Sequence, residues 1–502
     1  MNPALPDKKL NEARELLNYS KCSQALLAYE KLIRQYANKA QIWLEYGAAA
    51  AGAGRLDLAD RVWNKASELE PRNGEIMLKI GHQYRGLRQP EKARAWFQKA
   101  AAADPGAINP HMAMAVLAEQ NHNFPEAREA VASCLAIDPL DDQARYFAAL
   151  LDRRENKLED AERRLRDLIA SEPQHQYVQY ASKYELADVL DRTGRFDEAM
   201  QMLLEAKNLV RRIGDVEQML REYDEEAGHY RRLSQGYPKD ILRTWIRNFP
   251  ESAREPMPRQ AFLGGHPRSG TTLLEQILGA HPGVAALDEP QAFRMIVCPL
   301  WNASAQISAP RYNVIRRRYL DALQREWGGS LEGKLLLDKN PSHTCRFCIW
   351  LPLFPELRAL IALRDPRDVV ISCFFQNIPL NFANANFLTL ERTARHYADL
   401  MDVWLAARRW EGFAWMETRY EDIVADLEKE GRRVTEFLGL AWDPAQARFH
   451  EKSSKKRMYS PTYHDATQPV YARSVARWRA YEKHLAPILP VLEPYCRTLG
   501  YS

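Results

Sequence analysis

The stretch GGHPRSGTTLLEQIL at 264–278 carries residue types that could bind a phosphate group. The short apolar run QAFLGG leads into it, and the apolar residues of LLEQILGA fit one face of a helix. In a strand, loop and helix of this order, the backbone N–H groups of the loop and the positive end of the helix point at one place. We therefore predict that residues 265–272 bind an oxyanion without the help of a metal.

This loop lacks the lysine of a nucleoside-triphosphate P-loop. GHPRSGTT fits G-x-x-x-x-G, but Thr271 stands where the P-loop pattern requires lysine. Without that lysine, γ-phosphoryl transfer loses a main source of charge stabilisation. A magnesium site of this kind also needs an acidic residue at the end of a strand. The sequence has no clear residue of this type, and Asp338 comes nearest to the pattern. A less positive loop suits a less negative donor, such as a sulfuryl group carried on a single nucleotide phosphate.

Strands and helices alternate after this loop and must position it. KLLLD (334–338), RALIAL (358–363) and GFAWMETRY (412–420) have the apolar character of short strands. The segments RDVVISCFFQ, HYADLMDVWLAARRW and EDIVADLEKEGRRVTEFLGL have helical periodicity. This alternation predicts a P-loop-like α/β domain with a mostly parallel sheet, whose ligand lies at the carboxyl ends of the strands.

The first half of the chain has a repeat of 34 residues. Alanines recur at this interval, at 25, 59, 93, 127 and 161, and so do prolines, at 71, 105, 139 and 173. The spacing of Trp43, Gly47, Ala59, Trp63, Ala66 and Pro71, repeated by Gly81, Tyr84, Ala93, Phe97, Ala100 and Pro105, resembles the tetratricopeptide repeat. This resemblance implies an all-α solenoid of about six helix pairs over residues 1–210, the last around Gly194 and Ala199.

The solenoid indicates a partner but no chemistry of its own. Its concave face is suited to a peptide or protein substrate. The alternative is that the repeats only stiffen the molecule or join it into a homodimer. We expect residues 211–257 to form a helical and proline-rich linker, which leads to the α/β domain at 258–502.

Two motifs of the second domain together resemble the signatures of one enzyme family. PRSGTTL, and LRDPRDVVIS at 363–372, are similar to the 5′-phosphosulfate loop and the 3′-phosphate site of sulfotransferases that use 3′-phosphoadenosine 5′-phosphosulfate (PAPS). The segments DEP, DKNP and RYEDIV also match. Within this family the likeness is greatest to protein-tyrosine sulfotransferases and to bacterial chains that join tetratricopeptide repeats to such a domain.

The resemblance assigns residues to the two ends of the donor. The 5′-phosphosulfate would be held by the loop residues Pro267, Arg268, Ser269, Gly270, Thr271 and Thr272. The 3′-phosphate would be held by Arg364 and Ser372, because a guanidinium with a hydroxyl at a helix start suits a dianion. Tyr420 would line the adenosine, and Ser460 or Thr462 would contact a phosphate from a segment that closes over the nucleotide. The alternative for Arg364 is an ordinary ion pair with Asp365 or Asp368.

Sulfuryl transfer also needs a base and a cation near the reacting oxygen atoms. Glu289, next to Asp288, matches the catalytic glutamate of the tyrosylprotein enzymes, and Lys339 matches the catalytic lysine of the family. Arg268 would lie beside the transferred group. The alternatives are a helix-capping pair of carboxylates and a solvated lysine. His266 is a second candidate base, although packing within the loop is the favoured interpretation.

One departure from the family pattern affects the substrate. In the family, the catalytic glutamate is followed by Thr-Arg, and this arginine helps to select acidic peptides. In this chain Glu289 is followed by Pro290-Gln291. A preference for acidic peptides is therefore left open. The basic run KSSKKR at 452–457 could attract a polyanionic donor, but a solvated surface run is favoured.

Composition excludes several other classes of protein. A chain of 502 residues with 46% hydrophobic and 27% charged residues can bury more than one core. Its formal net charge of +4 gives no global sign of nucleic-acid binding. No stretch approaches the roughly 18 apolar residues of a membrane span, and no secretion signal is evident. We expect a cytoplasmic protein.

The cysteines favour reduced thiols. There are seven, an odd number scattered along the chain. Only Cys345 and Cys348 form a CxxC pair, and a single pair of this kind is weak evidence for zinc.

These observations favour transfer of a sulfuryl group from PAPS to an acceptor hydroxyl, with a peptide or protein tyrosine as the first choice. A carbohydrate, lipid or small phenol would use the same residues. A kinase or nucleoside triphosphatase and a non-catalytic repeat scaffold remain as less favoured classes. No metal is expected, because PAPS has no β,γ-phosphate bridge for magnesium to hold.

Overall fold

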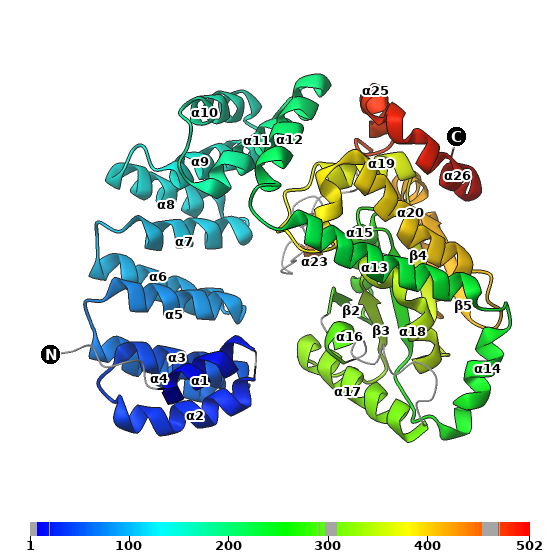
Figure 1. The fold of residues 1–502 in the computed structure, drawn as a ribbon, viewed down its shortest axis with the longest axis horizontal. Coiled ribbons are helices and arrows are strands. Elements are labelled where there is room, and N and C mark those ends of the chain that lie inside the picture. Colours follow the sequence, from blue (N-terminus) through cyan, green and yellow to red (C-terminus); the bar gives the residue numbers. More distant parts are fainter. Residues whose placement is uncertain are drawn as a thin grey trace. The chain divides into compact units, whose positions relative to one another are not determined.

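A computed structural model describes residues 8–19, 21–290, 292–296, 309–453, 470 and 472–501. The chain divides into two compact units, Met1–Val189 and Leu190–Ser502. Figure 1 shows both units, with the blue to cyan helices in the first and the green to red elements in the second. Among the described residues, no helix is both long and apolar enough to cross a membrane.

The first unit is built from antiparallel helix pairs. Their bounds are α1 Lys8–Asn18, α2 Cys22–Gln35, α3 Ala40–Gly52, α4 Leu56–Leu69, α5 Gly74–Gly86, α6 Pro90–Ala103, α7 Ile108–Gln120, α8 Phe124–Ile137, α9 Asp142–Arg154 and α10 Leu158–Ala170. From α3 onward, the first helix of each pair starts 34 residues after the start of the first helix of the preceding pair, and α11 (Gln176–Arg192) keeps this spacing. The predicted all-α repeat architecture is therefore confirmed.

Small residues allow the two helices of a pair to pack closely. Ala59 and Ala93, two of the repeated alanines, are fully buried. Gly81 of α5 faces Phe97 of α6 so closely that a Cβ atom at Gly81 would lie 2.4 Å from Cε1 of the ring. The aromatic residue of the second helix thus fills the space that the glycine of the first helix leaves open.

This packing gives a testable expectation for the repeat. Gly81→Ala forces a methyl group into the Phe97 ring and should lower the free energy of unfolding by about 1–3 kcal/mol. Gly86→Ala at the end of the same helix is the matched control, because nothing lies within 4 Å of the added Cβ. Alanine is the better helix former, so we expect this control to be neutral or slightly stabilising. Urea denaturation of the full chain measures both, and equal effects would contradict the packing argument.

The second unit contains a five-stranded parallel sheet. The strands are β1 Gln260–Gly265, β2 Val284–Asp288, β3 Leu335–Lys339, β4 Arg358–Leu363 and β5 Ala414–Arg419, in the order β2-β3-β1-β4-β5. All four pairings are parallel, with Leu263 opposite both Lys339 of β3 and Leu360 of β4. The predicted parallel α/β domain is confirmed, and its phosphate loop follows the central strand.

Helices cover both faces of this sheet. The helices that follow α11 in the second unit are α12 Phe196–Val210, α13 Val216–Gly236, α14 Ile241–Asn248, α15 Thr271–Gly279, α16 Ala292–Ile296, α17 Ala309–Trp327, α18 Phe347–Leu353, α19 Pro366–Phe374, α20 Leu390–Ala407, α21 Tyr420–Ala425, α22 Leu427–Phe437, α23 Phe449–Ser453, α25 Glu482–Leu485 and α26 Leu489–Leu499. Alternate residues of β1 face opposite sides. Ala261 and Leu263 join the core with α15 and α22, whereas Phe262 contacts the aromatic rings of Phe347 and Trp350 in α18.

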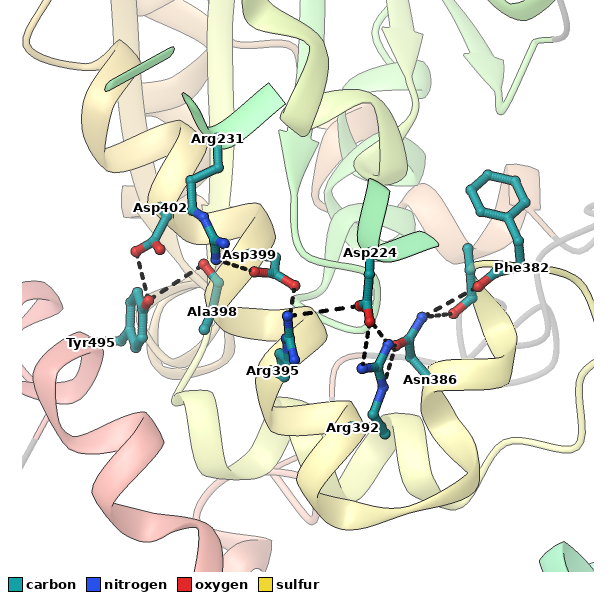
Figure 2. Close-up of polar contacts among 11 residues, drawn as sticks. Asp224, Arg231, Phe382, Asn386, Arg392, Arg395, Ala398, Asp399, Asp402 and Tyr495 are labelled. Atoms are coloured by element: carbon teal, nitrogen blue, oxygen red, sulfur yellow. Dashed lines mark hydrogen bonds and ion pairs between the residues drawn. The ribbon is translucent and has the colours of Figure 1, made fainter. Parts of the chain in front are cut away.

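Helix α13, in the stretch expected to be a linker, packs along α20 through polar contacts (Figure 2). Asp224 of α13 accepts hydrogen bonds from both terminal nitrogens of Arg392, at 3.2 and 2.8 Å. Two turns further on, Arg231 of α13 donates to Asp399 at 2.5 Å. The contacts divide the chain between Val189 and Leu190, so α12, α13 and α14 count with the second unit. The boundaries at 210 and 257 stay a prediction.

Two elements differ from the sequence-based expectation. The strand β2 was not predicted, although VAALD is a short apolar run that is buried almost throughout. The segment 421–440 was expected to be one helix, but it forms α21 and α22, which are separated at Asp426. The Asp426 side chain accepts a hydrogen bond from the Lys429 N–H and so caps the second helix.

Candidate active site

The predicted site residues lie at the carboxyl ends of the five parallel strands. The loop follows β1, Glu289 follows β2, Lys339 ends β3, Arg364 follows β4 and Tyr420 follows β5. Because all these ends lie at one edge of the sheet, residues far apart in sequence come together there.

The loop has the backbone shape that an anion-binding turn requires. Gly270 caps α15 with φ at +89°, and a Cβ atom there would lie 2.7 Å from the Tyr420 ring. Thr271 and Thr272 form the first turn of α15, whose N–H groups point out of the start of the helix. The Ser269 N–H instead donates to the His266 carbonyl at 3.1 Å. The amides of α15 are therefore the main backbone donors at this place.

The start of the loop is fixed by two buried polar contacts. The Thr344 hydroxyl accepts from the Gly265 N–H at 2.8 Å and donates to the Gly265 carbonyl at 3.0 Å. His266 contacts the Pro267 carbonyl through Nδ1 at 2.7 Å and His396 through Nε2 at 2.8 Å. Burial lowers the pKa of His266 to about 4. An imidazole that is buried and makes a hydrogen bond through each of its ring nitrogens fits the interpretation of His266 as a loop-packing residue.

Arg268, Ser372 and Arg364 form one connected group behind the loop. Arg268 donates from Nε to the Ser372 hydroxyl at 3.0 Å, and Arg364 donates from Nη1 to the Arg268 carbonyl at 3.1 Å. The guanidinium of Arg364 lies 4.9 Å from the centre of the Tyr420 ring. Ser372 is the seventh residue of α19, so its hydroxyl does not stand at the helix start as expected. The loop and the two residues assigned to the 3′-phosphate are thus in direct contact.

The two carboxylates considered as partners of Arg364 have other partners. Asp365 is bound by Arg367, from Nε at 2.9 Å and from Nη2 at 2.7 Å. Asp368 accepts two backbone N–H groups, those of Ala476 and Trp478. The Nε of Arg364 is buried and has no hydrogen-bond partner among the described residues. A buried guanidinium with an unused donor fits an anionic ligand better than a structural ion pair.

Lys339 contacts two carboxylates, one on the last residue of β2 and one on the residue after it. Its Nζ lies 2.5 Å from Oδ1 of Asp288 and 3.0 Å from Oε1 of Glu289. The lysine side chain is 1% exposed and that of Asp288 is 8% exposed, whereas that of Glu289 is 51% exposed. Lys339 is therefore not a solvated lysine. The Glu289 N–H also donates to the Lys339 carbonyl at 2.8 Å.

The cluster keeps its lysine charged. Burial lowers the pKa of Lys339, but the charges of Asp288 and Glu289 more than offset this, so its pKa lies above the ordinary value. Glu289 has a left-handed backbone with φ at +51°, which is uncommon for a residue with a side chain and occurs often at functional sites. The structure thus places a permanent cation and an accessible carboxylate at the same edge of the sheet as the loop.

A neighbouring carboxylate makes stability depend on pH. Asp338 is buried, and the Tyr319 hydroxyl donates to its Oδ2 at 2.6 Å. Burial raises the pKa of Asp338 to about 7. Between its ordinary pKa of about 4 and 7, the folded state holds one more proton than the unfolded state. Asp338 therefore makes the fold less stable as pH rises through this window.

Asp338→Asn should remove this dependence. Between pH 4 and pH 8, we expect the unchanged chain to lose stability relative to the variant. The difference in the free energy of unfolding should amount to on the order of 3 kcal/mol. Urea denaturation at several pH values measures the difference. Parallel pH profiles for the two proteins would contradict it.

Some predicted features lie outside this arrangement. Ser460, Thr462, Gln291 and residues 454–457 of the basic run lie outside the described residues. Cys345 and Cys348 are not joined by a disulfide bond, and the Cys345 thiol donates to the Ser342 carbonyl at 3.2 Å.

Sequence reasoning missed three contributors to the site. Thr344 and His396 hold the loop from elements other than its own, and no local signal marks them. Asp288 is the third, because the sequence alone shows it only as the neighbour of Glu289. Recognition of VAAL as a strand would have placed Asp288 at a strand end, beside Lys339.

Comparison with known proteins agrees with both parts of this description. Residues 260–444 match the sulfotransferase family, and residues 10–60, 74–106 and 148–212 match tetratricopeptide repeats. The second unit, a parallel α/β domain with a phosphate-type loop, thus contains a sulfotransferase domain. The chain carries tetratricopeptide repeats followed by this domain, as predicted.

The relatives are distant. The chain is 24% identical over 328 residues to an uncharacterized protein of Aquifex aeolicus (strain VF5), which is 62% of this chain and 41% of that protein. It is 24% identical to protein-tyrosine sulfotransferase A of Caenorhabditis elegans, over 48% of this chain and 67% of that one. Nodulation protein NoeE of Sinorhizobium fredii is 26% identical over 45% of this chain and 61% of its own length. The sulfotransferase domain of the Synechococcus PCC 7002 olefin synthase aligns with a TM-score of 0.32 and 19% identity, over 45% of this chain and 88% of that one.

Proposed function

We propose that this protein transfers a sulfuryl group from PAPS to an acceptor hydroxyl. The observation that carries the proposal is the buried Lys339, paired with Glu289, on the strand next to the one that ends in the phosphate loop. The loop lacks the P-loop lysine at Thr271, and Lys339 lies beside Leu263, two residues before the last residue of β1. The cation thus comes from a neighbouring strand.

The residues present fit the donor. The amides at the start of α15 and the hydroxyls of Thr271 and Thr272 would hold its 5′ end. Arg364, whose Nε is buried and unused among the described residues, would hold the 3′-phosphate together with Ser372. The bound donor supplies an activated sulfuryl group and a good phosphate leaving group. Arg268 connects the two ends of this site through Ser372.

Glu289 and Lys339 would then carry the chemical step. Glu289 is exposed enough to reach an acceptor hydroxyl and would take its proton as the new S–O bond forms. Lys339 holds the Glu289 carboxylate in place and, because it stays protonated, would stabilise charge that develops on the bridging oxygen. Asp288, the second contact of Lys339, would keep the lysine in position while Glu289 takes the proton.

A peptide or protein tyrosine is the proposed acceptor. Supporting it are the similarity to the protein-tyrosine sulfotransferase of C. elegans and the presence of repeats of a kind suited to binding a peptide. A carbohydrate, a lipid or a small phenol is the alternative, since the donor residues would serve any hydroxyl. We also predict that the protein is cytoplasmic, that the repeats bind the peptide substrate and that the chain forms a homodimer.

Calorimetry separates this function from that of a kinase. We expect 3′-phosphoadenosine 5′-phosphate to bind more tightly than ATP with magnesium, because Arg364 would recognise a 3′-phosphate and the loop has no lysine for a γ-phosphate. Tighter binding of the ATP complex would overturn the proposal. Failure to bind either nucleotide would favour a non-catalytic scaffold.

A further inference from the structure

The segment 474–481 connects the proposed 3′-phosphate site to α11. Its last part is a 3-10 helix, Arg477–Tyr481. Asp368, on α19, accepts hydrogen bonds from two backbone N–H groups of this segment, those of Ala476 at 2.8 Å and Trp478 at 2.7 Å. The guanidinium of Arg367 lies 3.8 Å from the centre of the Trp478 ring. The segment is therefore bound to the helix that also carries Ser372.

The same segment holds Arg364 in place. Arg364 donates from Nη2 to the Ser474 carbonyl at 2.5 Å and from Nη1 to the Arg268 carbonyl at 3.1 Å. These contacts occupy the terminal nitrogens on two sides and leave Nε without a partner among the described residues. If the segment moved, Arg364 would lose one of its two fixed acceptors and its orientation.

Asp191, near the end of α11, anchors the other end of the segment. Arg477 donates from Nε to Oδ1 at 3.2 Å, and its Nη2 lies 3.0 Å from Oδ2. The Tyr481 hydroxyl donates to Oδ1 at 2.6 Å. The side chain of Asp191 is 16% exposed, and Arg477 also packs on the Phe375 ring at 4.1 Å. A two-point, charge-assisted contact with an added hydroxyl is a strong anchor.

We propose that Asp191 is a positioning residue for the 3′-phosphate part of the nucleotide site. It acts through Arg477 and Tyr481, which fix the segment that orients Arg364. This inference rests on the proposed function. It also means that the nucleotide site depends on a residue in the stretch predicted to be solenoid, far before the expected start of the sulfotransferase domain at 258.

The test compares two nucleotides that differ only in the 3′-phosphate. Calorimetry on the full chain would use 3′-phosphoadenosine 5′-phosphate and adenosine 5′-monophosphate. If Asp191→Asn leaves the segment correctly placed in a tenth of the molecules, the Kd for the first nucleotide rises about tenfold. The Kd for the second should stay within about twofold, because Arg364 has no 3′-phosphate to bind. Tyr481→Phe, which removes only the hydroxyl, should shift the first Kd in the same direction by less.

Asp197→Asn is the matched control. Asp197 pairs with Lys483 at 2.6 Å and His484 at 2.9 Å, just beyond the segment, and its side chain is 63% exposed. Exposed ion pairs contribute little, so both affinities should stay unchanged. Unchanged affinity for 3′-phosphoadenosine 5′-phosphate in Asp191→Asn and Tyr481→Phe would overturn the inference, as would equal weakening of both nucleotides. If the unchanged chain did not distinguish the two nucleotides, the proposed donor would fail instead.

Discussion

Glu289→Gln should lower the rate of sulfuryl transfer by about 10²- to 10⁴-fold, the usual contribution of a positioned general base. Glutamine keeps the size of the side chain but cannot take a proton from the acceptor. The buried pair of Lys339 with Asp288 remains, so the fold and the nucleotide site should be retained. Single-turnover measurement of labelled sulfate transfer gives the rate, and calorimetry with 3′-phosphoadenosine 5′-phosphate gives the affinity.

The control makes the same change at the opposite edge of the sheet. Glu332 is exposed and lies just before β3 begins, whereas the site lies where β3 ends. Glu332→Gln should leave both rate and affinity unchanged. A Glu289→Gln variant with the rate of the unchanged protein would show that another group takes the proton.

Lys339→Met should lower both the rate and the stability. Loss of a preorganised cation at the reacting oxygen atoms should cost about 10²- to 10³-fold in rate, by analogy with loss of a single oxyanion donor. The change also leaves the carboxylate of Asp288 buried at the same place without its partner, which should lower the free energy of unfolding by about 3–5 kcal/mol. Transfer assays and urea denaturation measure the two effects separately.

A second change distinguishes these effects. Lys339→Met with Asp288→Asn also removes the buried carboxylate that Lys339 contacts, so much of the stability should return while the rate stays low. Lys334→Met is the matched control, because Lys334 lies just before β3 and its Nζ donates to the Pro282 carbonyl at 2.7 Å, away from the site. If the double variant regained the rate with the stability, Lys339 would be structural rather than catalytic.

Local sequence patterns were sufficient to predict most elements of the fold. The 34-residue period of alanines places side chains that must be small where two helices meet, and Ala59 and Ala93 are indeed fully buried. The apolar runs QAFLGG and RALIAL match β1 and β4 residue for residue. These patterns depend on neighbours close in the chain, which is why a single sequence shows them.

Contacts between distant residues could not be predicted in this way. The charges on α13 look like those of a solvated helix, yet Asp224 and Arg231 each find a partner on α20 that is 168 residues further along the chain. Asp191 likewise gives no sign of its contact with Arg477, 286 residues later. Such pairings follow from how the elements pack, and no spacing within one segment encodes them.

The candidate site shows the same division. The motifs predicted which residues stand at strand ends, and the structure brings Arg268, Arg364 and Ser372 into contact. The pairing of Lys339 with Asp288 and Glu289 depends on the register between β2 and β3, which places Asp288 opposite Lys339. That register involves a strand absent from the sequence-based prediction.

Transfer of labelled sulfate from PAPS to a panel of tyrosine peptides, sugars, lipids and phenols tests the central claim most directly. The account predicts metal-independent transfer to a hydroxyl, with the tyrosine peptides as the best acceptors, and loss of that transfer in Glu289→Gln. Transfer to a sugar or lipid instead would change the acceptor and leave the reaction in place. Phosphoryl transfer from ATP, with no sulfuryl transfer to any member of the panel, would contradict the account.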